Sequence, residues 1–118
     1  MAAGPIHIKR IYDPPSADDG QRVLIDRIWP RGVKREDAHL TQWLKDIAPS
    51  PDLRKWFGHD PARFEDFKAR YREELDANGD GVAALRALVR RGRVTLLYGA
   101  RDEAHNNAVV LADYLKKR

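Results

Sequence analysis

Two segments of the sequence combine an arginine, a backbone break and the end of a run of strand-forming residues. They are Asp26–Gly32, with the sequence Asp-Arg-Ile-Trp-Pro-Arg-Gly, and Tyr98–Asp102, with the sequence Tyr-Gly-Ala-Arg-Asp. Ligands of α/β sheets bind outside the carboxyl ends of parallel strands, where loops converge. If the two preceding strands are parallel, we expect Arg31 and Arg101 to clamp a phosphate or a carboxylate. The alternative is that each arginine pairs with a neighbouring aspartate and holds its own loop.

Two residues qualify as proton-transfer groups, and each has a structural alternative. Asp26 directly follows the apolar run Val23–Ile25, and a carboxylate in such a run is seldom fully buried unless it is paired. It acts either as a general base or as the partner of Arg27 or of loop amides. His59 is expected on a loop between two helices, where it is either an acid or base or simply an exposed side chain.

Further polar and aromatic residues extend the predicted site. Asn106 and Asn107 are expected in the first turn of the last helix, where their amides either contact a ligand or bond to the local backbone. Trp29 is the candidate for stacking on a nucleobase, because Trp43 and Trp56 fit apolar helical stripes that are typical of a core. The residues expected around one cavity with Asp26 are Arg27, Arg31, Tyr98, Arg101 and Asn106.

The charge balance favours a small anionic partner over a long nucleic acid. The chain has 118 residues, with 22 Lys+Arg against 18 Asp+Glu and a net charge of +4. Its two halves carry the same basic excess, so the sequence has no basic arm that would follow a phosphate backbone. We therefore expect an anionic small molecule or a nucleotide as the partner, with nucleic acid left open. The sequence does not indicate the oligomeric state.

The cysteine and histidine content excludes several kinds of chemistry. The chain has no cysteine, which rules out disulfides, thiolate nucleophiles and iron–sulfur clusters. Its four histidines show no metal-ligand spacing, so we expect no metal and no cofactor. No apolar run approaches the roughly 20 residues that cross a bilayer, and the first residues lack the pattern of a signal peptide. The expected location is the cytoplasm.

Apolar periodicity predicts the elements that position these residues. Strands are expected over Ile6–Tyr12, Arg22–Trp29 and Val94–Tyr98, and the relative direction of the first two stays open. Helices are expected over 37–48, over 51–57 after a Ser50 N-cap, from 60 to about 75, over 82–91, and from an Asp102 N-cap to about 115. The sequence thus predicts a single compact α/β domain over residues 1–118. Helices flank its small, largely parallel sheet of three or four strands.

Several motifs of the chain resemble a known family. They are Ile8-Lys9-Arg10-Ile11-Tyr12, Asp19-Gly20, the stretch from Arg22 to Gly32, Ala48-Pro49-Ser50, Leu53-Arg54-Lys55-Trp56-Phe57 and Thr95-Leu96-Leu97-Tyr98. From about Ile6 to Leu115 the chain is similar to the YeaO-like family, a bacterial group catalogued as a domain of unknown function. The resemblance implies a small cytoplasmic α/β domain with a largely parallel sheet, no known cofactor and no established reaction.

One position departs from the pattern of that family. Relatives usually have Asn-His-Ala where this chain has Asn106-Asn107-Ala108. The wider superfamily often places cysteine and histidine around the end of the third strand and the start of the last helix. If that histidine is an obligatory catalyst, this chain lacks it, and thiol chemistry cannot operate here.

Three functions are consistent with these residues. The leading hypothesis is binding of an anionic, phosphate-bearing ligand between the Trp29–Gly32 and Gly99–Asn106 loops. The second is a small hydrolase or transferase, independent of cysteine and of metal, that uses Asp26 or His59 for proton transfer and arginines for charge stabilisation. The third is a protein-interaction module in which the charged residues only hold loops in place.

Overall fold

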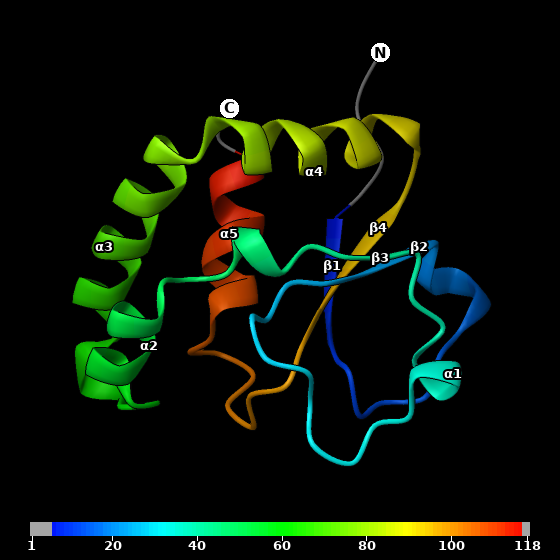
Figure 1. The fold of residues 1–118 in the computed structure, drawn as a ribbon, viewed down its shortest axis with the longest axis horizontal. Helices are drawn as coiled ribbons and strands as arrows, with labels where there is room; N and C mark the ends of the chain where they lie inside the picture. The colour runs from blue at the N-terminus through cyan, green and yellow to red at the C-terminus, as the bar shows by residue number, and fades with distance from the viewer. Residues whose placement is uncertain (1–5, 117–118) are drawn as a thin grey trace.

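A computed structural model describes residues 6–116 and places four parallel strands in one sheet (Figure 1). The strands are β1 (Ile6–Arg10), β2 (Gln21–Leu24), β3 (Gln42–Trp43) and β4 (Val94–Tyr98), in the order β1-β4-β2-β3. The predicted fold class, an α/β fold with a small parallel sheet, is confirmed. The first two strands are not neighbours, because β4 pairs with both of them in parallel.

The central strands are apolar because both faces of the sheet are covered. All five residues of β4 are buried, and Val23, Leu24 and Ile25 at the end of β2 are fully inaccessible. Alternate residues point to opposite faces of a sheet. Val23 and Leu96 accordingly pack in the larger core, while Leu24 and Leu97 pack in the smaller one.

The two faces carry layers of very different size (Figure 1). The larger layer consists of α2 (Pro51–Phe57), α3 (Phe64–Ala77), α4 (Gly79–Arg91) and α5 (Asn107–Lys116). The smaller layer contains the segment after β2 with the short helix α1 (Arg35–Ala38). Short 3-10 turns span Ala17–Asp19, Lys45–Ile47 and Pro61–Arg63. None of the helices within residues 6–116 is both long and apolar enough to cross a membrane.

Local capping signals fix the bounds of α2, as the sequence predicts. The Ser50 hydroxyl accepts a hydrogen bond from the Leu53 N–H at 3.2 Å, and Pro51 occupies the first helical position. Gly58 ends the helix in the left-handed conformation with φ 55°. These signals lie within a few residues of each other and can be read from the local sequence, while Glu74 on α3 additionally accepts hydrogen bonds from the Ser50 N–H at 2.8 Å and hydroxyl at 2.6 Å.

The predicted helix over 37–48 is wrong. Residues 42–43 form the edge strand β3 instead, where the Thr41 N–H donates to the Arg22 carbonyl at 2.8 Å and the Leu44 N–H donates to the Leu24 carbonyl at 2.9 Å. The Trp43 indole N–H donates to the Asp26 carbonyl at 2.7 Å. The helical spacing of the apolar residues favours a helix only when the segment is considered alone. In the folded protein, pairing with the edge of β2 is more favourable, and the segment forms a strand.

The predictions for the first strand and the last helix also need correction. The strand predicted over Ile6–Tyr12 ends at Arg10, and Ile8 and Tyr12 are 36% and 45% exposed at this edge of the sheet. Asp102 is not the N-cap of α5. That helix begins at Asn107, and the Asn106 side-chain oxygen accepts a hydrogen bond from the Val109 N–H at 3.0 Å.

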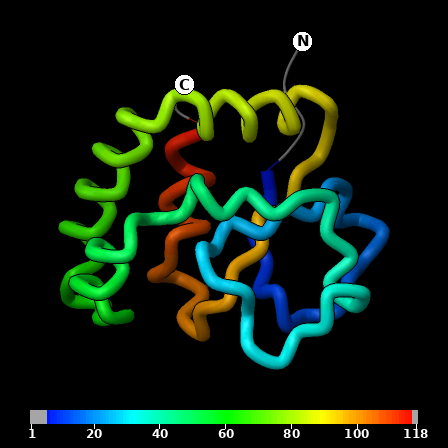
Figure 2. Tube along the Cα trace, in the orientation of Figure 1, coloured from blue at the N-terminus to red at the C-terminus, as the bar shows by residue number. Residues whose placement is uncertain are grey.

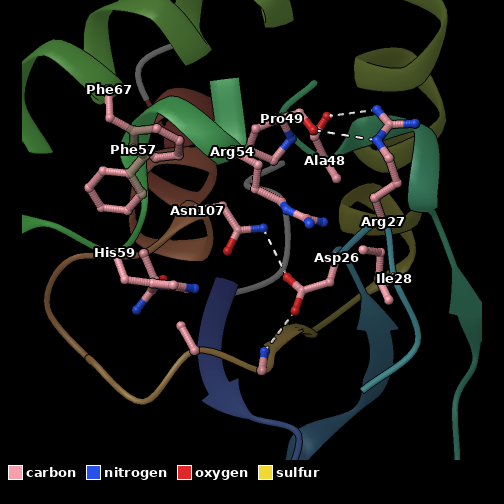
Figure 3. A pocket seen from close by; sticks show the side chains of 13 residues that line it. Asp26, Arg27, Ile28, Ala48, Pro49, Arg54, Phe57, His59, Phe67 and Asn107 are labelled. Carbon is pink, nitrogen blue, oxygen red and sulfur yellow. Dashed lines mark hydrogen bonds between the residues drawn. The ribbon is translucent and has the colours of Figure 1, made fainter. Parts of the chain in front are cut away.

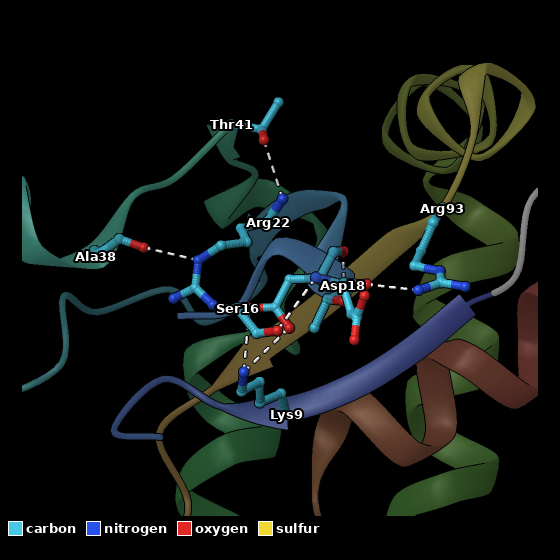
Figure 4. A network of polar contacts seen from close by, with 9 residues as sticks. Lys9, Ser16, Asp18, Arg22, Ala38, Thr41 and Arg93 are labelled. Carbon is cyan, nitrogen blue, oxygen red and sulfur yellow. Dashed lines mark hydrogen bonds and ion pairs between the residues drawn. The ribbon is translucent and has the colours of Figure 1, made fainter. Parts of the chain in front are cut away.

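A buried ionic network fixes the start of β2 (Figure 4). Asp19 accepts hydrogen bonds from the Lys9 ammonium at 3.1 Å, from the Ser16 N–H at 3.0 Å and from the Arg22 guanidinium. The same guanidinium donates through Nε to the Ala38 carbonyl at 3.0 Å. Burial alone raises the pKa of Asp19, but the bonds from Ser16, Lys9 and Arg22 together hold it below its usual value. The network thus joins β1, β2 and α1 around an ionised carboxylate.

We expect Gly20→Ala to destabilise the fold by about 2 kcal/mol or more, because Gly20 has φ 63° and an added Cβ would lie 2.7 Å from the Arg93 carbonyl oxygen. Thermal unfolding followed by circular dichroism measures the effect. Gly79→Ala is the matched control, since nothing lies within 4 Å of its added Cβ at the start of α4, and it should leave stability unchanged or raise it slightly. Equal melting temperatures for the two variants would contradict the expectation.

Candidate functional site

A pocket of about 290 Å³ lies at the carboxyl ends of β2 and β4, against α2 and the start of α5 (Figure 3). The segments that follow these two strands leave the sheet at the same end, as expected for parallel strands (Figure 2). The lining residues are Asp26, Arg27, Ile28, Ala48, Pro49, Arg54, Phe57, His59, Phe67, Gly99, Ala100, Asn106 and Asn107. Three separate parts of the sequence therefore meet in one cavity.

Asp26 holds two of these segments together. One oxygen of its carboxylate accepts the Gly99 N–H at 2.8 Å, and the other accepts the Asn107 side-chain N–H at 3.0 Å. Position 99 admits only a small residue, because a Cβ there would lie 3.2 Å from the Asp26 carboxylate. The carboxylate thus links the end of β2 to the loop after β4 and to the first residue of α5.

The surroundings of Asp26 act on its ionisation in opposite directions. Burial in the wall of the pocket raises its pKa above the usual 3.8, and this effect prevails. The hydrogen bonds from Asn107 and Gly99, and the charges of Arg54 and His59, favour the carboxylate and oppose the rise. A carboxyl group with a raised pKa in a cavity is typical of functional sites.

The orientation of the Asn107 amide follows from its acceptors. Its NH₂ group donates to the Asp26 carboxylate at 3.0 Å and to the Ile25 carbonyl at 3.3 Å. The reversed amide would place its oxygen against these two acceptors, which is repulsive. The side-chain oxygen of Asn107 therefore faces the space of the pocket (Figure 3).

Two side chains that can carry a positive charge line this pocket. Arg54 on α2 and His59 just after it are exposed, and within residues 6–116 neither side chain makes a hydrogen bond or ion pair. His59 has φ 58°, an uncommon conformation for a residue other than glycine, and directly follows the left-handed Gly58. These consecutive left-handed residues turn the chain so that the His59 side chain lines the pocket (Figure 3).

Arg27 lines the pocket but is engaged elsewhere. Its guanidinium donates to the Ala48 carbonyl at 3.3 Å and to the Pro49 carbonyl at 3.4 Å, and lies 3.9 Å from the Asp46 carboxylate. These contacts hold residues 46–49 against the end of β2. Arg27 therefore shapes the pocket, while Arg54 and His59 offer free donors to it.

The two arginines expected to form a clamp do not line this pocket. Arg31 and Arg101 are both exposed. The main-chain carbonyl of Arg31 accepts a hydrogen bond from the Tyr12 hydroxyl at 2.9 Å, and the preceding Pro30 is buried. These contacts hold the turn in place, while the Arg31 side chain lies in solvent. The loops converge as predicted, but the arginines that line the cavity are Arg27 and Arg54.

The remaining predicted residues divide between pocket and core. Asn106 lines the pocket, but its amide also donates to the Asp102 carbonyl at 2.9 Å and caps α5, which agrees with the backbone-bonding alternative. Tyr98 and Trp29 are not among the lining residues. Tyr98 is buried in the larger core, and the Trp29 indole N–H donates to the Val33 carbonyl at 2.8 Å.

Sequence reasoning missed Arg54 and the role of Asn107. Arg54 looks like any solvent-facing residue of a short helix, although its spacing of three from Phe57 places both on one side of α2. Only the packing of α2 over the ends of β2 and β4 turns that side into a pocket wall. Among residues 6–116 there is no group of three histidines or carboxylates that could hold a metal ion.

The fold and the site define a small parallel α/β protein with a polar pocket at the carboxyl ends of its central strands. Residues 5–118 match a family model described as the inactive DUF488-N3 subclade. The chain is 44% identical over 113 residues to the uncharacterized protein Rv3073c of Mycobacterium tuberculosis, covering 96% of this chain and 95% of that protein. It is 40% identical over 111 residues to the uncharacterized protein YeaO of Escherichia coli, covering 94% and 96%. The chain therefore belongs to the YeaO-like, DUF488-N3 family; no solved structure matches it.

We expect Asp26 to titrate above 3.8, and Asp19 below it, in carbon-detected NMR of the side-chain carboxyls. Because folding raises the pKa of Asp26, its contribution to stability is full below pH 3.8 and is lost as the pH rises through the folded-state value. Asn107→Ala should raise the pKa of Asp26 further, since it removes a hydrogen bond that favours the carboxylate. A midpoint for Asp26 at or below that of Asp19 would show that burial does not dominate.

Proposed function

We propose that this protein binds a small anionic ligand, bearing a phosphate and of nucleotide size or smaller, in the pocket at the ends of β2 and β4. The observation that carries the proposal is the pair Arg54 and His59, two exposed basic or titratable side chains that line one cavity and have no hydrogen-bond or ion-pair partner within residues 6–116. Arginine offers a fork of donors that matches phosphate and carboxylate. An anion that enters the pocket therefore meets unsatisfied donors.

The dimensions of the pocket limit the ligand. Its volume of about 290 Å³ lies at the lower end of the range for small-molecule sites, roughly 300 to 1,000 Å³. Apolar walls from Ile28, Pro49 and Phe57 suit the carbon skeleton or base of a small ester. Ile28 is 60% exposed, so a ligand can cover it on binding. A dinucleotide or a long polymer would extend far outside such a cavity.

Binding is favoured over catalysis by the chemistry of the lining residues. The thirteen residues that line the pocket in the described part of the chain include no serine, threonine, cysteine or lysine to act as a nucleophile. Both oxygens of Asp26 already accept hydrogen bonds that hold the fold together. The matching family model is described as inactive, which agrees with a binding role. We propose that this binding takes place in the cytoplasm and that residues 1–118 act as one domain.

A hydrolase or transferase is the second candidate. It is favoured by the presence of Asp26 and His59 in the same pocket, with the pKa of Asp26 raised by burial. In that reaction Asp26 would transfer the proton while Arg54 stabilises the developing charge. A protein-interaction module, in contrast, would need no ligand in the cavity at all.

We expect Arg54→Gln to weaken binding of inorganic phosphate and AMP about tenfold or more, because it removes a charged donor from the rim of the pocket. Isothermal titration calorimetry at fixed, low ionic strength measures the dissociation constants. Arg31→Gln is the matched control, since it removes the same charge from an exposed side chain that does not line the pocket. Equal losses in both variants would mean that general attraction to a basic protein, and not this pocket, binds the anion.

A measurement of catalytic turnover distinguishes a binding protein from a hydrolase or transferase. We expect no release of phosphate from p-nitrophenyl phosphate or AMP above the rate seen with Asp26→Asn and His59→Asn, because the lining residues include no hydroxyl, thiol or lysine nucleophile and both oxygens of Asp26 already accept hydrogen bonds. Malachite green detection of phosphate measures the rate. Release by the natural protein that either substitution abolishes would favour the enzyme, and failure to bind any phosphate compound would favour the interaction module.

A further inference from the structure

We propose that the ligand is a zwitterion whose ammonium group lies against Asp26 and Asn107 while its phosphate lies against Arg54 and His59. This rests on the proposed function and names the class of its ligand. The pocket is polar at two places of opposite character, and both must be satisfied by one small molecule. A phosphate ester of a short amino alcohol has this arrangement.

The inner wall of the pocket, which is formed by Asp26 and Asn107, presents hydrogen-bond acceptors. The Asn107 NH₂ is committed to the Asp26 carboxylate and the Ile25 carbonyl, so the amide oxygen is turned to the cavity and accepts no hydrogen bond from residues 6–116. Each oxygen of Asp26 accepts one hydrogen bond, from Gly99 or from Asn107, whereas a carboxylate has about four acceptor positions. A group placed here must donate.

An anion is repelled from this wall. The Asp26 carboxylate lies beside the first residue of α5, at the place where a helix N-terminus would otherwise attract negative charge. The phosphate is therefore directed to Arg54 and His59, which lie on α2 and the turn after it and line the same pocket (Figure 3). Arg54 makes no ion pair with Asp26, although its charge favours the ionised form of that carboxylate, and both side chains line the same pocket.

An ammonium group satisfies the wall better than a hydroxyl group. It supplies three donors and a positive charge, whereas a hydroxyl supplies one donor and brings acceptor lone pairs toward two acceptors. Hydrogen bonds between an ammonium and a carboxylate are about twice as strong as those between neutral groups. The partly desolvated position of Asp26 strengthens this difference.

Three phosphate esters that share a two-carbon chain test the proposal on the natural protein. O-Phosphoethanolamine ends in an ammonium, 2-hydroxyethyl phosphate in a hydroxyl and ethyl phosphate in hydrogen, with inorganic phosphate as the reference anion. Titration calorimetry near pH 7 is expected to show that O-phosphoethanolamine binds at least tenfold more tightly than either of the other esters. In NMR spectra it alone should shift the side-chain amide signals of Asn107 strongly.

The variant Asp26→Asn tests whether the preference for O-phosphoethanolamine arises at the inner wall. It should reduce the advantage of O-phosphoethanolamine over ethyl phosphate to less than threefold, because it removes the charge that the ammonium contacts. A melting curve shows whether the variant is folded, and if it is not, the comparison of esters on the natural protein decides alone. Equal affinities for all three esters would overturn this inference and leave the proposed function standing. Absence of binding by every phosphate compound would overturn both.

Discussion

The hydrogen bonds to the Asp26 carboxylate hold together the carboxyl ends of β2 and β4, and the pocket depends on them. Asp26 accepts the main-chain N–H of Gly99 and the side-chain N–H of Asn107, while its own carbonyl accepts the indole N–H of Trp43. One residue at the end of β2 thereby joins the loop after β4, the start of α5 and the edge strand β3. Loss of such a partner leaves buried donors unsatisfied, at a cost of about 1 to 3 kcal/mol for each. The same carboxylate packs closely against Gly99, where an added Cβ would lie 3.2 Å from its oxygen.

The structural role of Asp26 also determines the electrostatics of the pocket. A carboxylate held by two donors and enclosed by apolar walls keeps its position, and its acceptor character becomes a fixed feature of the inner wall. Arg54 and His59 face it from a separate element, because α2 packs across the strand ends. The opposite charges lie on different elements, and Asp26 forms no ion pair with Arg54 or His59 within residues 6–116. A pocket of this kind selects a ligand by the positions of the positive and negative groups on that ligand.

Two aspartates at the two ends of β2 show how the environment separates identical side chains. Asp19 is buried among Lys9, Arg22 and a main-chain N–H, and its pKa falls below the usual value. Asp26 has only uncharged donors within hydrogen-bond distance, and burial raises its pKa. At Asp19 the hydrogen bonds from Ser16, Lys9 and Arg22 together outweigh the desolvation, whereas at Asp26 the bonds from Asn107 and Gly99 do not. The first aspartate supports the fold, while the second also faces a cavity.

The sequence by itself determined the elements whose signals are local. The β-branched run of β4, the Ser50 and Gly58 caps of α2 and the parallel α/β class all follow from short-range patterns. Tertiary structure decided the rest. Residues 42–43 became a strand because the edge of β2 was available, and Arg54 became a pocket residue because α2 lies over the strand ends. Periodicity tells which side chains face inward on one element, but it carries no information about which other element meets them. That choice depends on contacts between residues far apart in the chain, such as Asp26 with Gly99 and Asn107, which only the folded structure brings together.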